Sequence, residues 1–272
     1  MSEHQKQLDA AVQAVAHAQV KNIYLVACGG SKAIMEAPQY IFDREIEEPA
    51  QVYTSNEFIH RAPKALGKGS LVILCSHSGT TPETVAAAKF ARSSGALTVA
   101  LSHVVGSPLW EAAEYPVHYD HGEGAVASEM TNGILYRLVF QILNALHPQP
   151  KYDKALAVMD GLQKITDANK VLFAASAQAY GQKNKREKLI YTLASGPNYG
   201  VAYSFSICLL MEMLWINSSA IHSGEFFHGP LEITDYDVPF IIIKGTGETR
   251  PLDDRAEKFI AGFSKNVEVI DA

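Results

Sequence analysis

The chain has 272 residues, of which 47% are hydrophobic and 19% charged, and its formal net charge is −6. This length suits one large α/β unit or two domains of common size, and this composition excludes a disordered chain. Because the balance is acidic and no dense block of Lys and Arg occurs, we expect neither nucleic acid nor an anionic membrane as a partner.

Apolar strand patterns alternate with helical patterns along the chain. Strands are expected at 22–27, 51–55, 71–76, 96–102 and 116–120, and a long helix from about 129 to 146 ends at His147-Pro148-Gln149-Pro150. A helical stretch (151–185), a strand (189–194), an apolar helix and two late strands, VPFIIIKG and VEVIDA, follow. The alternation predicts an α/β fold with two domains of the same layout, 1–150 and 151–272, each a doubly wound parallel sheet flanked by helices.

The cysteines, the amino-terminal segment and the break in the uncharged run from 189 to 211 indicate the cellular compartment. Cys28, Cys75 and Cys208 are odd in number and lack a zinc-type spacing, so we expect buried thiols in a reducing environment. The amino-terminal segment is a polar amphipathic helix pattern without a signal-peptide core. The uncharged run from 189 to 211 breaks at Ser195-Gly196-Pro197-Asn198, which predicts strand, turn and helix rather than a membrane span. We therefore predict a cytoplasmic protein.

Two turns in the first half look suited to phosphate. One follows the first strand and opens a helix, and the other follows the third strand and leads into Pro82, a good first helical residue. A helix N-terminus offers free N–H groups, and hydroxyls complete an anion cradle, although ordinary N-capping is the alternative. No Walker lysine is present, which favours a small phosphorylated metabolite over a nucleotide. The expected phosphate ligands are Ser31, Ser76, His77, Ser78 and Thr81, with Gly29 and Gly30 beside the substrate.

Glu212 is the single formal charge between Lys188 and Glu225. Burial in an apolar helix would raise the pKa of such a carboxyl toward the range of a general acid or base. The alternative is a Glu that faces solvent or caps a buried backbone group. His228 follows sixteen positions later (228 − 212) in GEFFHGPLE, so the two groups form a candidate proton-transfer pair. Glu225 opens this loop and either orients His228 or caps the short helix.

These motifs resemble a known family. CGGS, SHSGTTPET and the paired strand–turn–helix patterns resemble the sugar isomerase (SIS) domain, a sugar-phosphate-binding module, present here in tandem. YTLASGPNYG followed by MEMLWINSSAIHSGEFFHGPLEI is similar to the fructosamine 6-phosphate deglycases, above all the 6-phosphofructose-aspartate branch. The fructoselysine 6-phosphate branch fits the Phe226-Phe227 pair less well. Family members continue past the position of Ala272, so we expect a shortened or truncated chain.

The resemblance also implies roles for individual residues. Glu212 and His228 match, at the same spacing, the base and the ring-opening residue in the isomerase half of glucosamine-6-phosphate synthase. The segment 124–128 resembles the loop that meets the sugar in that enzyme, which makes Ser128 a candidate substrate contact. In those relatives the matching His comes from the neighbouring subunit, so a homodimer or larger oligomer with shared sites is expected. Trp215 and Phe226 are expected in the core.

The implied reaction is the cleavage of a 6-phosphorylated Amadori product to glucose 6-phosphate and a free amino acid. His228 would assist ring opening, Glu212 would move a proton from C1 to C2, and water would hydrolyse the resulting imine. No metal or organic cofactor is expected. An aldose–ketose or aminosugar phosphate isomerase uses the same two residues and is the alternative. A non-catalytic sugar-phosphate sensor is disfavoured because the Glu/His pair is intact and no DNA-binding segment is present.

Overall fold

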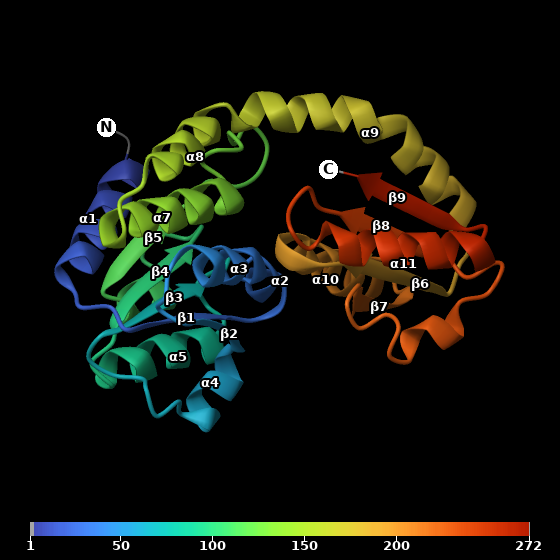
Figure 1. Ribbon diagram of the computed structural model, residues 1–272. Helices are drawn as coiled ribbons and strands as arrows, with labels where there is room; N and C mark the ends of the chain where they lie inside the picture. The colour runs from blue at the N-terminus through green and yellow to red at the C-terminus, as the bar shows by residue number, and fades with distance from the viewer. Residues whose placement is uncertain (1–2, 272) are drawn as a thin grey trace. The chain divides into compact units, whose positions relative to one another are not determined.

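The computed structural model describes residues 3–271 (Figure 1), so Met1, Ser2 and Ala272, at the ends of the predicted first helix and last strand, lie outside the described range. The chain divides into two compact units after Lys170. Each unit is an α/β structure with one parallel sheet flanked by helices, which confirms the predicted fold class at that level. No helix among the described residues is long and apolar enough to cross a membrane.

The first unit contains a five-stranded parallel sheet in the order β2-β1-β3-β4-β5. The strands are β1 (Asn22–Ala27), β2 (Ala50–Thr54), β3 (Ser70–Cys75), β4 (Leu97–Ser102) and β5 (Tyr115–His118). The helices are α1 (Glu3–His17), α2 (Gly29–Ala33), α3 (Glu36–Glu45), α4 (Ser55–Arg61), α5 (Pro82–Ser93), α6 (Pro108–Ala112), α7 (Thr131–Leu146) and α8 (Pro150–Asp160). Pro116 lies on the edge strand β5, where its missing N–H costs least.

Both faces of this sheet are buried, which explains the unbroken apolar runs of β1 and β3. Leu71 and Ile73 pack with residues of α1, α3 and α7, whereas Val72 and Leu74 pack with residues of α4, α5 and α6. Successive side chains of a strand point to opposite faces, so a strand covered on both sides must be apolar at every position. Figure 1 shows the two helical layers of this unit.

The second unit contains a four-stranded parallel sheet in the order β7-β6-β8-β9. Its strands are β6 (Leu189–Ala194), β7 (Asn217–His222), β8 (Phe240–Lys244) and β9 (Val267–Asp271). A 3-10 turn (Gly196–Asn198) leads into α10 (Tyr199–Ser204), which continues as a π-helix (Phe205–Met213), and a second 3-10 turn (Pro230–Ile233) and α11 (Arg250–Phe263) follow. With β6, β7, β8 and β9 in place of β1, β2, β3 and β4, the strand order repeats that of the first unit.

The second unit contains a strand that the sequence did not predict. No strand was expected between the apolar helix and the two late strands, but residues 217–222 form the edge strand β7. The division falls inside α9 (Leu162–Asn184), twenty residues after the predicted boundary at 150. The reason is that α8 packs on α7, where Tyr152 is buried and donates a hydrogen bond to Glu45.

Candidate functional site

The two phosphate-type turns lie side by side in the first unit. They follow β1 and β3, which are neighbours in the sheet although β2 comes between them in the chain. The strand order 2-1-3-4-5 reverses at this point, and such switch points are the usual ligand crevices of open α/β sheets. Thr84 of α5 contacts residues that follow β1 and β2. Its Oγ1 lies 2.9 Å from Ser55 Oγ, at the start of α4 after β2, and 3.9 Å from Cys28 Sγ, which follows β1.

The hydroxyls of the second turn pair with one another. Ser76 Oγ lies 2.8 Å from Thr81 Oγ1, and Ser78 Oγ lies 2.8 Å from Thr80 Oγ1. Ser76 is buried, whereas Ser78 is exposed. Thr81 is the N-cap residue of α5, yet among the described residues its side chain makes no capping hydrogen bond. Ordinary N-capping therefore does not account for Thr81.

Gly79 gives the second turn its tight shape. Its φ is +66°, and a Cβ built on it would lie 1.9 Å from Ser107 Oγ and 2.8 Å from Ser102 Oγ. Its carbonyl accepts a hydrogen bond from Leu109 N at 2.9 Å, which ties the turn to α6. Only glycine combines a left-handed conformation with this close approach.

A chain of side-chain contacts connects the two turns. Burial raises the pKa of the Cys75 thiol to about 11, and this thiol hydrogen-bonds Ser31 of the first turn and the Tyr119 hydroxyl. Burial also raises the pKa of Tyr119, with Cys75 as a further cause. Tyr119 Oη in turn lies 3.0 Å from Nδ1 of His77 in the second turn. Ser31 and His77 are thus held by one buried pair of residues.

His77 is exposed and belongs to a stack of histidine rings. It stacks on His103, with centroids 5.3 Å apart, and meets His121 edge to face at 4.4 Å. Burial lowers the pKa of His77, and His121 and His103 lower it further. The isolated site therefore favours a neutral imidazole, which would offer a phosphate a hydrogen bond more readily than a positive charge.

Ser128 lies apart from this group of contacts. It lines a cavity of about 230 Å³ together with His4, Gln5, Arg137 and Asp160. Gly133 at the start of α7 packs closely beneath it, since a Cβ there would lie 2.5 Å from the Ser128 carbonyl oxygen. Whether Ser128 contacts a substrate stays a prediction.

Glu212 is exposed in the second unit, so the prediction of a carboxyl buried within the chain was wrong. It lies on the π-helix, whose wider turns are marked by the bond from Leu214 N to Leu209 O. π-helical turns recur at functional sites. The apolar side chains around it are exposed too, with Met211 at 43%, Met213 at 71% and Trp215 at 88%. The prediction that Trp215 lies in the core was also wrong.

His228 and Glu225 lie on a turn that follows β7. The turn is closed by backbone bonds from Glu225 N to His222 O (2.8 Å) and from His228 N to Glu225 O (2.9 Å). Phe226 is fully buried against Phe259, as predicted, and anchors the turn. With the backbone fixed in this way, the side chains of Glu225 and His228 are left exposed.

Within one chain β7 separates Glu212 from His228. Glu212 lies five positions before the first residue of β7 (217 − 212), and His228 lies six positions after its last residue (228 − 222). A strand of this length spans about 17 Å at roughly 3.3 Å per residue. The fold of the second unit therefore places the two groups at opposite ends of the strand.

The comparisons with known proteins agree with this architecture. The family model of the SIS domain matches residues 18–143. Fructosamine deglycase FrlB from Bacillus subtilis is 50% identical over 254 residues, which are 93% of this chain and 77% of FrlB. Fructoselysine 6-phosphate deglycase from Escherichia coli K12 is 30% identical over 96% of this chain and 76% of its own length. The chain belongs to the fructosamine deglycase family of SIS-domain proteins.

Solved structures place this family member in the same fold. A Bacillus subtilis protein assigned to the phosphosugar isomerases superposes with a TM-score of 0.96 and 48% identity, covering 98% of this chain and 81% of its own. The C-terminal domain of glucosamine-fructose-6-phosphate aminotransferase from Francisella tularensis gives a TM-score of 0.81 at 16% identity, a likeness of fold alone. Members of the deglycase family are enzymes, so the prediction of an enzyme is confirmed at the family level.

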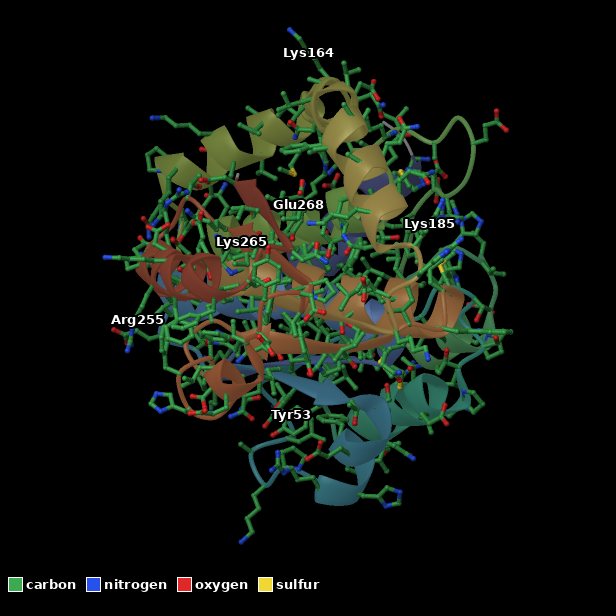
Figure 2. All side chains as sticks on the ribbon, turned by 90° about the vertical axis from the view of Figure 1, so that its right-hand side faces the viewer. Tyr53, Lys164, Lys185, Arg255, Lys265 and Glu268 are labelled. Carbon is green, nitrogen blue, oxygen red and sulfur yellow. The ribbon has the colours of Figure 1, made fainter. Side chains whose placement is uncertain are left out.

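Sequence reasoning missed the residues that support the turns of this deglycase-family chain. Tyr119 and His103 follow β5 and β4, and Ser107 precedes α6, so none of them belongs to a recognisable motif. The sequence could have indicated those that follow a strand, because residues after neighbouring parallel strands lie at the same edge of the sheet. A cavity of about 740 Å³ in the second unit was missed as well. It is lined by Leu214, Trp215, Lys185 and residues of α9 and β9. Figure 2 labels two of the lining residues, Lys185 and Glu268 of β9.

Proposed function

We propose that this chain is a fructosamine 6-phosphate deglycase, which cleaves a 6-phosphorylated Amadori product to glucose 6-phosphate and a free amino acid. The observation that carries the proposal is the 50% identity to fructosamine deglycase FrlB over 93% of the chain. A 6-phosphofructose derivative of aspartate is the first substrate to test, on the strength of the 212–233 sequence block.

The phosphate of this substrate would bind at the switch point between β1 and β3. Ser31, Ser76, Ser78 and Thr81 would donate hydrogen bonds from their hydroxyls, with Gly29 and Gly30 close to the sugar. Support comes from the placement of both turns after the neighbouring strands β1 and β3 and from the Thr81 hydroxyl, which α5 does not use for capping. His77, held by Tyr119, would supply a further hydrogen bond.

The chemistry would need one base and one ring-opening group. His228 would move a proton at the ring oxygen to open the sugar, with Glu225 beside it on the same turn. Glu212 would take a proton from C1 while the C2 carbonyl becomes an enaminol, and would return the proton at C2. The C1 imine formed in this way reacts with water and releases the amine and glucose 6-phosphate. The C2 carbonyl accepts the electrons of the C1–H bond, and the lone pair of the substrate nitrogen forms the C1 imine when C2 is protonated, so the proposed reaction includes no metal and no organic cofactor.

We further propose that two SIS domains follow each other, with a predicted boundary near residue 150, and that the active unit is a homodimer or larger. The repeated strand order of the two sheets supports the tandem arrangement. Two features support the oligomer. Glu212 is surrounded by exposed apolar side chains, which a second copy would cover. Glu212 and His228 also lie at opposite ends of β7, so a complete Glu/His pair would take His228 from the partner subunit.

The substrate test uses three compounds in parallel. The purified protein is incubated with fructose-aspartate 6-phosphate, fructoselysine 6-phosphate and fructose 6-phosphate, and glucose 6-phosphate is measured with its dehydrogenase. Release of glucose 6-phosphate from either amine compound, but not from fructose 6-phosphate, supports a deglycase. Conversion of fructose 6-phosphate alone would identify an isomerase and refute the proposal. Glu212→Gln is the negative control.

A further inference from the structure

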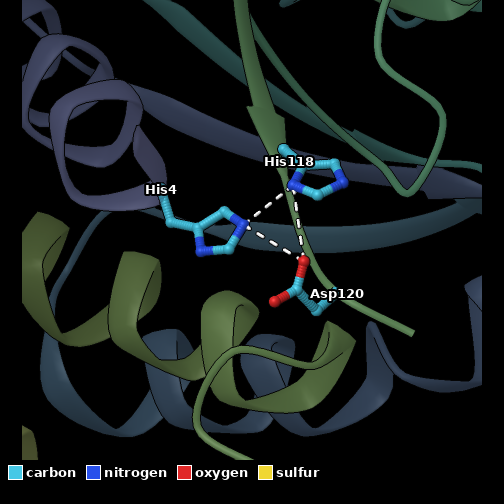
Figure 3. Close-up of side chains that lie close together, drawn as sticks. All are labelled: His4, His118 and Asp120. Atoms are coloured by element: carbon cyan, nitrogen blue, oxygen red, sulfur yellow. Dashed lines mark hydrogen bonds and ion pairs between the residues drawn. The ribbon is translucent and has the colours of Figure 1, made fainter. Parts of the chain in front are cut away.

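Three side chains from distant parts of the sequence converge beside the edge strand β5 (Figure 3). They are His4 near the start of α1, His118 at the end of β5, and Asp120 two residues later. His4 Nε2 lies 2.8 Å from His118 Nδ1 and 3.6 Å from Asp120 Oδ1, and His118 Nδ1 lies 3.8 Å from Asp120 Oδ1. Each residue therefore turns one electron-pair donor toward the same point.

The spacing of these three atoms fits a metal ion. Three atoms separated by 2.8, 3.6 and 3.8 Å all lie about 2.0 Å from one common point, close to the bond lengths of about 2.0–2.2 Å that zinc forms with imidazole nitrogen and carboxylate oxygen. The ion needs no large rearrangement of the side chains. Three protein ligands leave a further position for water in a four-coordinate site, and His4 lines the cavity of about 230 Å³.

The surroundings hold the three residues in place. The backbone N–H of His118 donates to Gln7 Oε1 of α1 at 2.8 Å, which joins the helix that carries His4 to β5. The backbone N–H of Asp120 donates to the Glu129 carbonyl at 2.8 Å. The ring of His118 also hydrogen-bonds the backbone of His103. Metal-binding histidines typically make such a second hydrogen bond, which fixes the orientation of the ring.

The side chains are also sheltered enough to bind an ion and open enough to admit one. Their exposed fractions are 13% for His4, 21% for His118 and 39% for Asp120. Among the described residues, Nδ1 of His4 is buried without a hydrogen-bond partner, so Nε2 is the only ring nitrogen of His4 engaged in this cluster.

We propose that His4, His118 and Asp120 form a binding site for a divalent transition-metal ion, with Zn²⁺ as the best match. Two imidazoles and one carboxylate suit zinc and its first-row neighbours, whereas Mg²⁺ and Ca²⁺ prefer all-oxygen sites. The bound ion ties the amino-terminal helix α1 to β5. None of the three residues belongs to the proposed deglycase chemistry, in which no metal takes part.

The test measures metal binding directly on the whole chain without a histidine tag. The metal-free protein competes with a chromophoric chelator for Zn²⁺, and Co²⁺ is added separately to record the absorption bands of a protein-bound ion. His4→Ala and Asp120→Asn each remove one ligand. His17→Ala is the matched control, because His17 lies on the same helix and its ring bonds the Gln13 carbonyl, away from the cluster. Circular dichroism of the metal-free variants checks that each is folded.

The expected result is one equivalent of Zn²⁺ in the parent and in His17→Ala, and affinity lower by at least about 100-fold in both ligand variants. Zn²⁺ should raise the melting temperature of the parent and of His17→Ala but not of the ligand variants, and Mg²⁺ should have no effect. Two outcomes would overturn the proposal: no Zn²⁺ binding by the parent, or parent-like affinity in folded Asp120→Asn. Either would mean that the three side chains form only a hydrogen-bonded cluster.

Discussion

Replacing Gly79 by alanine should destabilise the turn at residues 76–81, which is the proposed phosphate site. At φ +66° an alanine costs about 1–2 kcal/mol, because the left-handed conformation brings its Cβ close to its own backbone. The new Cβ would also lie 1.9 Å from Ser107 Oγ and 2.4 Å from Ser107 Cβ, and overpacking of this kind costs about 1–3 kcal/mol more. We expect the first unit to lose about 2–5 kcal/mol of unfolding free energy.

Gly106→Ala is the matched control. Gly106 has nearly the same backbone angle, φ +69°, but nothing lies within 4 Å of a Cβ built there. It should cost only the conformational part, about 1–2 kcal/mol, so the difference between the two variants isolates the overlap with Ser107. Ser107→Gly in the Gly79→Ala background removes both clashing atoms of Ser107 and should recover part of the loss.

Urea unfolding followed by tryptophan fluorescence measures this difference. Trp110 lies in α6 of the first unit, and Trp215 is 88% exposed in the second, so a Trp215→Phe background reports on the first unit alone. Isothermal titration with inorganic phosphate follows the turn itself, and only Gly79→Ala should weaken binding. Equal stability losses in the two glycine variants, or no recovery with Ser107→Gly, would refute the reasoning.

Four further predictions concern the site. Glu212→Gln should keep the fold and substrate binding but abolish turnover, and deuterium exchange at C1 surviving in this variant would remove the base assignment. Ser78→Ala should weaken phosphate binding about tenfold or more, since a hydrogen bond to a charged group contributes about 1.5–3 kcal/mol. It should leave stability unchanged because the Ser78–Thr80 bond is exposed, whereas Ser76→Ala and Thr81→Ala should also lower stability because the bond between their hydroxyls is part-buried. Mixing inactive Glu212→Gln and His228→Asn proteins after dissociation should restore some activity, and its absence despite proven subunit exchange would place both groups in one chain. Because burial raises the pKa of Cys75 to about 11, only about one thiol in a thousand is ionised at pH 8, so iodoacetamide should leave Cys75 unmodified until the protein unfolds, as peptide mass spectrometry can show.

The local patterns of the sequence determined the elements of the first unit. The apolar runs at 22–27 and 71–76 became central strands covered on both faces, and Pro116 marked the edge strand. The hydroxyl-rich turn before Pro82 pointed to the N-terminus of α5. These features are encoded within a few neighbouring residues, since alternation, turn residues and capping residues act locally.

The same local reasoning failed where an element is weakly patterned. Residues 217–222 contain two serines and an asparagine, because β7 is an edge strand in which Ile221 is the one buried residue. Without a clear two-residue alternation, no strand was expected there. Glu212 was expected to be buried because the segment around it is apolar, but an exposed apolar surface has the same composition as a core.

Only the tertiary structure decided which residues meet. The strand order that makes β1 and β3 neighbours brings residues 28–31 beside 76–81, and β7 keeps Glu212 and His228 apart within one chain. His4 reaches His118 across 114 positions, a spacing that matches no metal motif. Contacts of this kind depend on how sheets order their strands and how helices pack across them. That order follows from the packing of the whole chain, whereas a local pattern reports only on residues a few positions apart.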